Sequence, residues 1–309
     1  MTSLGIYLRG VLMGAADIVP GVSGGTMAFI TGIYDRLLGS IRSVDIAFVR
    51  KVLALDIRGA WEHVNGGFLL ALLLGIATSI VTLSRVISWV LEHHPVPLWA
   101  FFFGLILASS LVLVRHVPAW NVARLVCLFT GIAVAATIAL APMINLDIGL
   151  PGVFFAGFLA ICAMILPGIS GSFILVLLGM YGPTLLAVKE FDVSYLLVLI
   201  AGAVCGLLVF SRLLHWLLQR FHDGTMALLT GFLFGSLLVV WPWKRVLLWV
   251  DSSSGSLKPA QQAPVLPDAF LVHTGTEPQV GLCIAMMVVG FTLVWFVERR
   301  WGQEAGASP

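Results

Sequence analysis

The chain has 309 residues, of which 60% are hydrophobic and 10% are charged, and its formal net charge is +2. Soluble domains carry about 25% charged residues, so this composition excludes a soluble enzyme and predicts an integral membrane protein. The small net charge, without a basic block, argues against nucleic-acid binding. The four cysteines lie inside apolar runs and lack the paired spacing of metal ligands, so we expect no metal site and no cofactor.

The N-terminal apolar segment is expected to stay in the protein. Arg9 interrupts it, and no small-residue cleavage pattern follows a continuous apolar core. Six later runs approach the ~20 residues that cross a bilayer as a helix. These runs cover residues 66–91, 97–114, 122–142, 194–218, 225–241 and 280–297.

Two further apolar regions, 4–39 and 152–188, are each interrupted by a motif rich in glycine. The first motif, 20–25, reads Pro-Gly-Val-Ser-Gly-Gly, and the second, 167–172, reads Pro-Gly-Ile-Ser-Gly-Ser. Proline and glycine end a helix at each motif, and the arms on either side are short for a spanning helix. Each region therefore predicts a re-entrant hairpin, with one long kinked span as the alternative.

Both motifs belong to an internal repeat. Residues 18–24 (IVPGVSG) match residues 165–171 (ILPGISG), and 32–34 (GIY) match 179–181 (GMY), in each case 147 residues further along the chain. A second block repeats after 127 residues, and the difference places a longer loop at 40–65 in the first copy. In this block Gly75, Ser84, Arg85, Trp89 and Gly104 correspond to Gly202, Ser211, Arg212, Trp216 and Gly231.

We expect an all-α membrane protein of two inverted repeats in one domain, 1–309, because three spans after each re-entrant hairpin would turn the second copy upside down. Twelve lysines and arginines then fall on the cytoplasmic side with both termini, and five fall outside. Four spans per repeat is the alternative. The expected parts are repeat 1 at 5–142 (hairpin 5–39, loop 40–65, spans 66–142) and repeat 2 at 152–298 (hairpin 152–188, spans 194–297, outside loop 242–279).

The motifs are also candidate anion sites. A helix should begin after each break, near Gly25 or Ser172, and its first N–H groups and positive dipole end favour an anion. Hydroxyl groups add donors, and glycines let a ligand approach the backbone. Small residues that merely pack tightly at a kink are the alternative. The predicted binding residues are Ser23, Gly24, Gly25, Thr26, Ser170, Gly171 and Ser172.

Four charged residues within or next to the apolar runs complete the candidate site. Arg85 and Arg212 occupy equivalent positions in the repeat, and their forked guanidinium groups suit a phosphate. Snorkelling to the interface is the alternative for both. Asp17 and Glu190 are candidates for accepting a coupling proton. Asp17 has an uncharged counterpart, Met164, and could instead bond to hairpin backbone, while Glu190 also fits an interfacial position.

Residues 14–26 (GAADIVPGVSGGT) and 165–172 (ILPGISGS) resemble the two signatures of a bacterial membrane family associated with undecaprenyl-phosphate transport, and the resemblance extends over about residues 5–298. It implies a multi-pass inner-membrane flippase that returns this lipid carrier from the outer to the cytoplasmic leaflet for reuse in cell-envelope and peptidoglycan synthesis. Two hairpin tips would hold the phosphate near the midplane. The partners would be the polyprenyl-phosphate lipid, the bilayer and a coupling proton or cation, with an oligomer left open.

Two rival functions use the same residues. A secondary transporter of a small anion would use the hairpin chemistry without a lateral opening for a lipid tail. A membrane polyprenyl-diphosphate phosphatase is the enzymatic rival, because one such family carries a Pro-Gly-x-Ser-Arg-Ser motif. Here Gly24 replaces the arginine, and no span carries a Glu-x-x-x-Glu pair. The sequence therefore favours a transporter over an enzyme.

Overall fold

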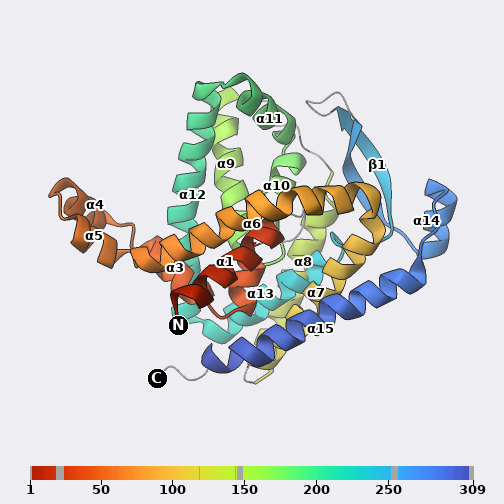
Figure 1. Ribbon diagram of the computed structural model, residues 1–309, viewed down its shortest axis with the longest axis horizontal. Helices are drawn as coiled ribbons and strands as arrows, with labels where there is room; N and C mark the ends of the chain where they lie inside the picture. The colour runs from red at the N-terminus through yellow and green to blue at the C-terminus, as the bar shows by residue number, and fades with distance from the viewer. Residues whose placement is uncertain are drawn as a thin grey trace.

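The computed structural model describes residues 2–18, 24–117, 119–142, 144, 149–251 and 257–305. Helices make up most of the chain, and they pack as antiparallel and crossed pairs (Figure 1). The N-terminal half contains α1 (Ser3–Asp17), α2 (Gly24–Ile30), α3 (Tyr34–Arg42), α4 (Ile46–Leu53), α5 (Ile57–His63), α6 (Gly66–His93), α7 (Pro95–His116) and α8 (Val122–Leu140).

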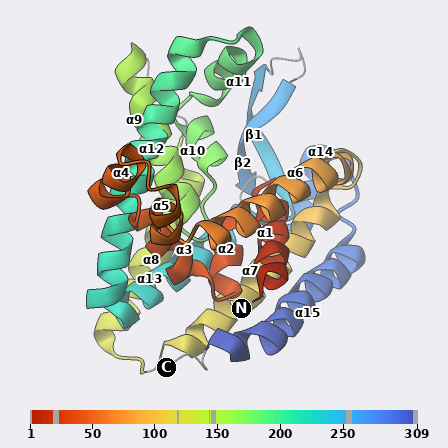
Figure 2. The same ribbon diagram turned by 60° about the vertical axis from the view of Figure 1, so that its left-hand side comes forward.

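The C-terminal half has the same order of helices, with an added hairpin. It contains α9 (Gly149–Ile165), α10 (Gly171–Leu177), α11 (Tyr181–Glu190), α12 (Val193–Arg220), α13 (His222–Ser236), β1 (Lys244–Asp251), β2 (Leu257–Pro264), α14 (Pro267–Thr274) and α15 (Val280–Ala305). Figure 2 shows α9 beside α12 and α1 beside α6 from a second direction.

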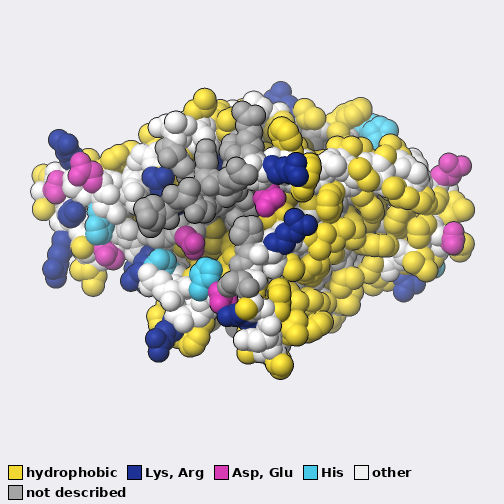
Figure 3. Space-filling model, turned by 90° about the horizontal axis from the view of Figure 1, so that it is seen from below, with side chains coloured by type: hydrophobic (Ala, Val, Ile, Leu, Met, Phe, Trp, Pro, Cys, Tyr) yellow, Lys and Arg dark blue, Asp and Glu magenta, His cyan; other side chains and the backbone are white. Residues whose placement is uncertain are grey.

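Four described helices contain segments long and apolar enough to cross a membrane: Gly66–Leu83, Pro95–Arg115, Val122–Leu140 and Val193–Arg220. The pair α10 and α11 passes the same test when taken together, with a bend of 107°, as a broken span or a re-entrant loop. The broad hydrophobic surface in Figure 3 fits contact with lipid tails. The prediction of a helical, multi-pass membrane protein is therefore confirmed.

Two predicted spans have different bounds from those expected. The run 225–241 corresponds to α13, which ends at Ser236 and is largely buried among its neighbours. The run 280–297 corresponds to α15, whose apolar part, Val280–Phe296, is short for a span. The hydrophobicity of α13 thus supplies buried packing surface, which sequence alone does not distinguish from surface that faces lipid.

The stretch 251–279 has more structure than its polar composition predicts. β1 and β2 pair as an antiparallel hairpin, with Lys244 opposite Pro264. The indole N–H groups of Trp241 and Trp243 donate 2.8 Å hydrogen bonds to the carbonyls of Val265 and Pro278 and so fasten this region to the end of α13. Two tryptophans that were assigned to an aromatic belt therefore anchor a small sheet, which is an addition to the expected all-α fold.

Close approach of backbones holds the main helix pairs together. A methyl group placed on Gly75 of α6 would lie 2.2 Å from the Tyr7 carbonyl oxygen of α1, and one on Gly202 of α12 would lie 2.0 Å from the Phe154 carbonyl oxygen of α9. Helices in lipid gain little from the hydrophobic effect when they associate, so such contacts between small residues supply much of the packing energy. The two pairs use glycines that the sequence repeat matches.

The two halves correspond element by element. α10 begins 147 residues after α2, and α11 begins 147 residues after α3, while α12 begins 127 residues after α6 and has the same length of 28 residues. The glycine before each of α3 and α11 has the same left-handed backbone, with φ of 69° at Gly32 and 70° at Gly179. The offsets in the structure are therefore the offsets of the sequence motifs.

Candidate functional site

The two glycine-rich motifs meet in the interior of the protein. The Gly168 N–H donates a 2.9 Å hydrogen bond to Oγ1 of Thr26, which is fully buried. Nearby, the Tyr34 hydroxyl donates a 2.9 Å bond to the Ile165 carbonyl, at the end of the helix that leads into the second motif. The prediction that the motifs share a site has this contact in its favour. Ser23 lies outside the described residues.

A carboxylate occupies the start of the helix after the first motif. Asp17 Oδ1, at the end of α1, accepts a 2.6 Å hydrogen bond from the Gly24 N–H, the first residue of α2. A methyl group on Gly24 would lie 2.4 Å from Asp17 Oδ2, so glycine is needed for this approach. The hydrogen bond to hairpin backbone, one of the two interpretations of Asp17, is thus present. An anion that binds the backbone here has to compete with this side chain.

The second motif is turned sharply and exposes one hydroxyl pair. Gly168 has φ +90°, which favours glycine, and a methyl group there would approach Ser236 Oγ to 2.7 Å. Ser170 precedes α10 without capping it, and its Oγ lies 2.8 Å from Ser172 Oγ. The Gly171 backbone packs against α9, where an added methyl would lie 2.6 Å from the Ala160 carbonyl oxygen. In contrast to the first motif, no carboxylate bonds to this helix start within the described residues.

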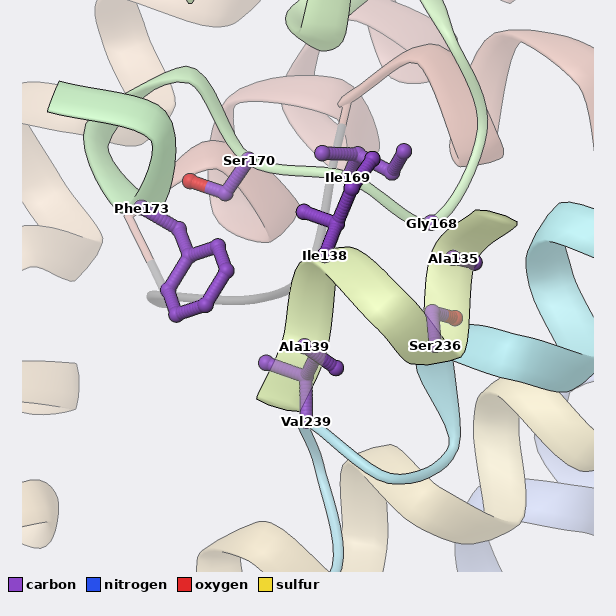
Figure 4. A pocket seen from close by; sticks show the side chains of 9 residues that line it. All are labelled: Ala135, Ile138, Ala139, Gly168, Ile169, Ser170, Phe173, Ser236 and Val239. Carbon is purple, nitrogen blue, oxygen red and sulfur yellow. The ribbon is translucent and has the colours of Figure 1, made fainter. Parts of the chain in front are cut away.

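A small hollow of about 250 Å³ opens beside the second motif (Figure 4). Its wall is mostly apolar and includes two hydroxyl-bearing residues, Ser170 and Ser236, of which Ser236 donates a 2.8 Å bond to the Leu233 carbonyl. A mostly apolar wall with few polar groups suits an amphipathic ligand. The lining residues come from α8, the second motif, α10 and the end of α13. They are Ala135, Ile138, Ala139, Gly168, Ile169, Ser170, Phe173, Ser236 and Val239.

The predicted arginines lie elsewhere in this structure. Arg212 is exposed on α12, and its guanidinium donates to the carbonyls of Leu208 (3.2 Å) and Val44 (3.0 Å). Arg85 is exposed on α6, and Glu190 is exposed at the end of α11. Within the described residues, neither arginine makes a hydrogen bond to either motif. The structure therefore brings together Thr26, Gly168 and the Ser170 region, and it leaves these three charged residues outside that group.

Arg9 is a buried charge that the sequence analysis did not select. Its side chain is 2% exposed, and its Nε donates a 3.2 Å hydrogen bond to the Thr31 carbonyl, just after α2. Arg9 and Asp17, eight residues apart on α1, thus sit at opposite ends of the seven-residue α2. Their charges have the signs that stabilise a helix dipole, the carboxylate at the N-terminus and the guanidinium at the C-terminus. The spacing on one helix was the available signal.

A second, more polar hollow of about 440 Å³ lies where α3 meets α12. It is lined by Gly39, Arg42, Ser43, Asp45, His63 and His215. The Phe48 N–H and the His63 side chain both bond to Asp45, and these hydrogen bonds lower the pKa of its carboxyl below the ordinary value. Across the described parts of the chain, no group of three or more histidine, cysteine or acidic residues could hold a metal ion.

Comparison with known proteins supplies the family. The family model described as undecaprenyl phosphate translocase-like matches residues 13–258. The chain belongs to this family. It is 46% identical over 299 residues to the polyprenyl-phosphate transporter of Vibrio cholerae serotype O1, with 97% of each chain covered. It is 31% identical over 265 residues to the polyprenyl-phosphate transporter of Staphylococcus aureus, with 79% of this chain and 89% of the relative covered.

No solved structure matches the chain significantly. The resemblance found in the two motifs is nevertheless confirmed, because the family match begins before the first motif and extends past the second. Membership of the undecaprenyl phosphate translocase-like family gives the buried contact between the motifs a functional setting, since the two signatures are the parts of the chain that the fold brings together.

Proposed function

We propose that this protein is a flippase that returns undecaprenyl phosphate from the outer to the cytoplasmic leaflet of the bacterial inner membrane for reuse in cell-envelope synthesis. The observation that carries the proposal is the 46% identity, over nearly the whole of both chains, to a polyprenyl-phosphate transporter. The multi-pass helical fold supports it, since a carrier lipid can keep its tail in the bilayer while a protein shields its phosphate. The protein acts as a transporter and not as a phosphatase.

We further propose that the phosphate binds where the two motifs meet. The contact between Thr26 and Gly168 and the Ser170–Ser172 hydroxyl pair support this placement, because they gather hydroxyl groups and backbone N–H groups next to a mostly apolar hollow. Such donors can replace the hydration shell of an anion in a site that excludes water. The residues assigned to the phosphate are Ser23, Gly24, Gly25, Thr26, Ser170, Gly171 and Ser172, with Arg85 and Arg212 contacting it during entry and exit.

The proposed architecture is an inverted repeat of residues 5–142 and 152–298, with both termini in the cytoplasm. Matching helix lengths and matching glycine contacts in the two halves support it. Inverted repeats place a site between the halves and alternate its exposure. In this scheme Asp17 accepts the coupling proton, because a protonated carboxyl group would release the start of α2 to the substrate, and Glu190 is the second candidate.

A reconstitution experiment tests the function. Purified protein in liposomes should move polyprenyl phosphate between leaflets, measured with a headgroup-modifying reagent added outside, and Ser170→Ala should slow this movement. Inorganic phosphate and polyprenyl diphosphate are the comparison substrates. Transport of inorganic phosphate alone would instead identify a small-anion carrier, and release of phosphate from the diphosphate would identify an enzyme.

A further inference from the structure

Two hydrogen bonds join the N-terminal hairpin to the C-terminal half. The Tyr34 hydroxyl at the start of α3 donates to the Ile165 carbonyl of α9, and Arg212 of α12 donates to the Val44 carbonyl just after α3. We call these two bonds the α3 junction. The polar hollow with Arg42 and His215 lies at the same contact between α3 and α12.

The sequence repeat maps the α3 junction onto a second set of residues. With the offsets of 147 and 127, Tyr34 corresponds to Tyr181 and Ile165 to Ile18, while Arg212 corresponds to Arg85 and Val44 to Phe191. Three of these four correspondences keep the same residue type, and the fourth supplies only a backbone carbonyl. The chain therefore carries the donors and acceptors for a mirror junction, in which Tyr181 would bond to Ile18 and Arg85 to Phe191.

The mirror junction is not formed in the described part of this structure. Tyr181 and Arg85 make no such hydrogen bonds there, and α11 packs against α12 of its own half and not against α6. Figures 1 and 2 both place α11 beside the upper end of α12. The remaining helix contacts do correspond between halves, as α1 with α6 and α9 with α12, or α8 with α13 and α15 with α7. The asymmetry is thus concentrated where the hairpins meet the opposite half.

We propose that Tyr181 and Arg85 are positioning residues of the transport cycle, forming the mirror junction in the opposite state of the carrier while Tyr34 and Arg212 release the α3 junction. This inference rests on the proposed transport function. Two copies of one unit that can exchange equivalent contacts have two arrangements of similar free energy, and a substrate can select between them. The structure then represents the state in which the side of the α3 junction is closed.

The backbone contains a hinge at the right place in both halves. Gly32 and Gly179, each two residues before the junction tyrosine, share the left-handed φ of about 70° and the same pattern of turn hydrogen bonds. Glycine tolerates such conformations and can absorb a large change in φ and ψ at low cost. α3 and α11 can therefore swing about equivalent points while α2 and α10 remain packed within their halves.

Two cysteine pairs report the two junctions. Ser43→Cys with His215→Cys probes the α3 junction, since both residues line the hollow between α3 and α12. The corresponding mirror pair is Glu190→Cys with Ser88→Cys. Each pair is placed in full-length protein whose four native cysteines are replaced by alanine, reconstituted in liposomes and treated with a short, reducible thiol cross-linker. We expect both pairs to cross-link, each cross-link to stop lipid transport, and reduction to restore it.

Tyrosine variants provide the decisive readout. Tyr181→Phe should lower cross-linking of the mirror pair and raise that of the α3 pair, and Tyr34→Phe should do the opposite, each by about fivefold, the effect of one net hydrogen bond. A purely structural role would change both pairs in the same direction or neither, and that result overturns the proposal. So would a mirror pair that never cross-links in protein that transports. If the opposite shifts appear without polyprenyl-phosphate transport, the proposed function fails and the junction exchange stands.

Discussion

The Gly168 N–H and the Thr26 hydroxyl, 142 residues apart in the chain, form a 2.9 Å hydrogen bond in the buried centre of the protein. This bond joins the turn of one motif directly to the first helix of the other. Because both motifs are hairpin tips, their relative position depends on contacts of this kind and not on a continuous helix. Thr26 therefore has a structural role in assembling the site as well as its proposed role in binding phosphate.

Replacing Thr26 tests that role. Thr26→Val keeps the shape of the side chain but removes the acceptor, and it leaves a buried N–H without its partner at a cost of about 1–3 kcal/mol. We expect a lower melting temperature in detergent and slower transport of polyprenyl phosphate. Thr26→Ser keeps the oxygen and is the matched control, which should stay close to the native protein in both measurements. Equal stability of the valine and serine variants would contradict the structural role.

Asp17 separates charge from hydrogen bonding. Asp17→Asn keeps an oxygen that can accept from the Gly24 N–H, now 2.6 Å from Oδ1, but removes the group that takes up a proton. If Asp17 couples transport to protons, this variant should fold normally and move the lipid at a rate that no longer responds to a pH gradient across the liposome.

The matched variant is Asp17→Ala, which removes the acceptor as well and should lower stability by about 1–3 kcal/mol. Transport by Asp17→Asn that still follows the pH gradient would exclude Asp17 as the coupling group and direct attention to Glu190. An asparagine variant as unstable as the alanine variant would show that the negative charge at the start of α2 matters more than the hydrogen bond.

Much of this arrangement could be predicted from repetition in the sequence. The motif offsets anticipated the matching elements, and the pairing of Gly75 with Gly202 anticipated equivalent helix contacts. The burial of α13 could not be predicted, because a helix that packs against protein and one that faces lipid are equally apolar. Arg9 was missed for a related reason, since its bond to the Thr31 carbonyl depends on where α2 folds back, which no local pattern specifies.

The close contact between α1 and α6 predicts a sharp difference between two glycines of one helix. Gly75→Ala places a methyl group 2.2 Å from the Tyr7 carbonyl oxygen, and the backbones must separate, at a cost of about 1–3 kcal/mol. Gly67→Ala on the same helix meets nothing within 4 Å and should be neutral or slightly stabilising. Melting temperatures in detergent measure both variants, and similar values would contradict the packing described for α6.

Lys244, at the start of the β hairpin, makes stability depend on pH. Its ammonium lies 3.5 Å from the centre of the Trp99 ring, and burial lowers its pKa to about 7. In an unfolded chain lysine has a pKa of about 10.4, so between these values the unfolded state binds more protons and the free energy of unfolding should rise with pH. Denaturation at several pH values should show this rise, and Lys244→Met should flatten it. Replacing the exposed Lys189 with methionine is the control, and a slope unchanged in Lys244→Met would contradict the burial of its charge.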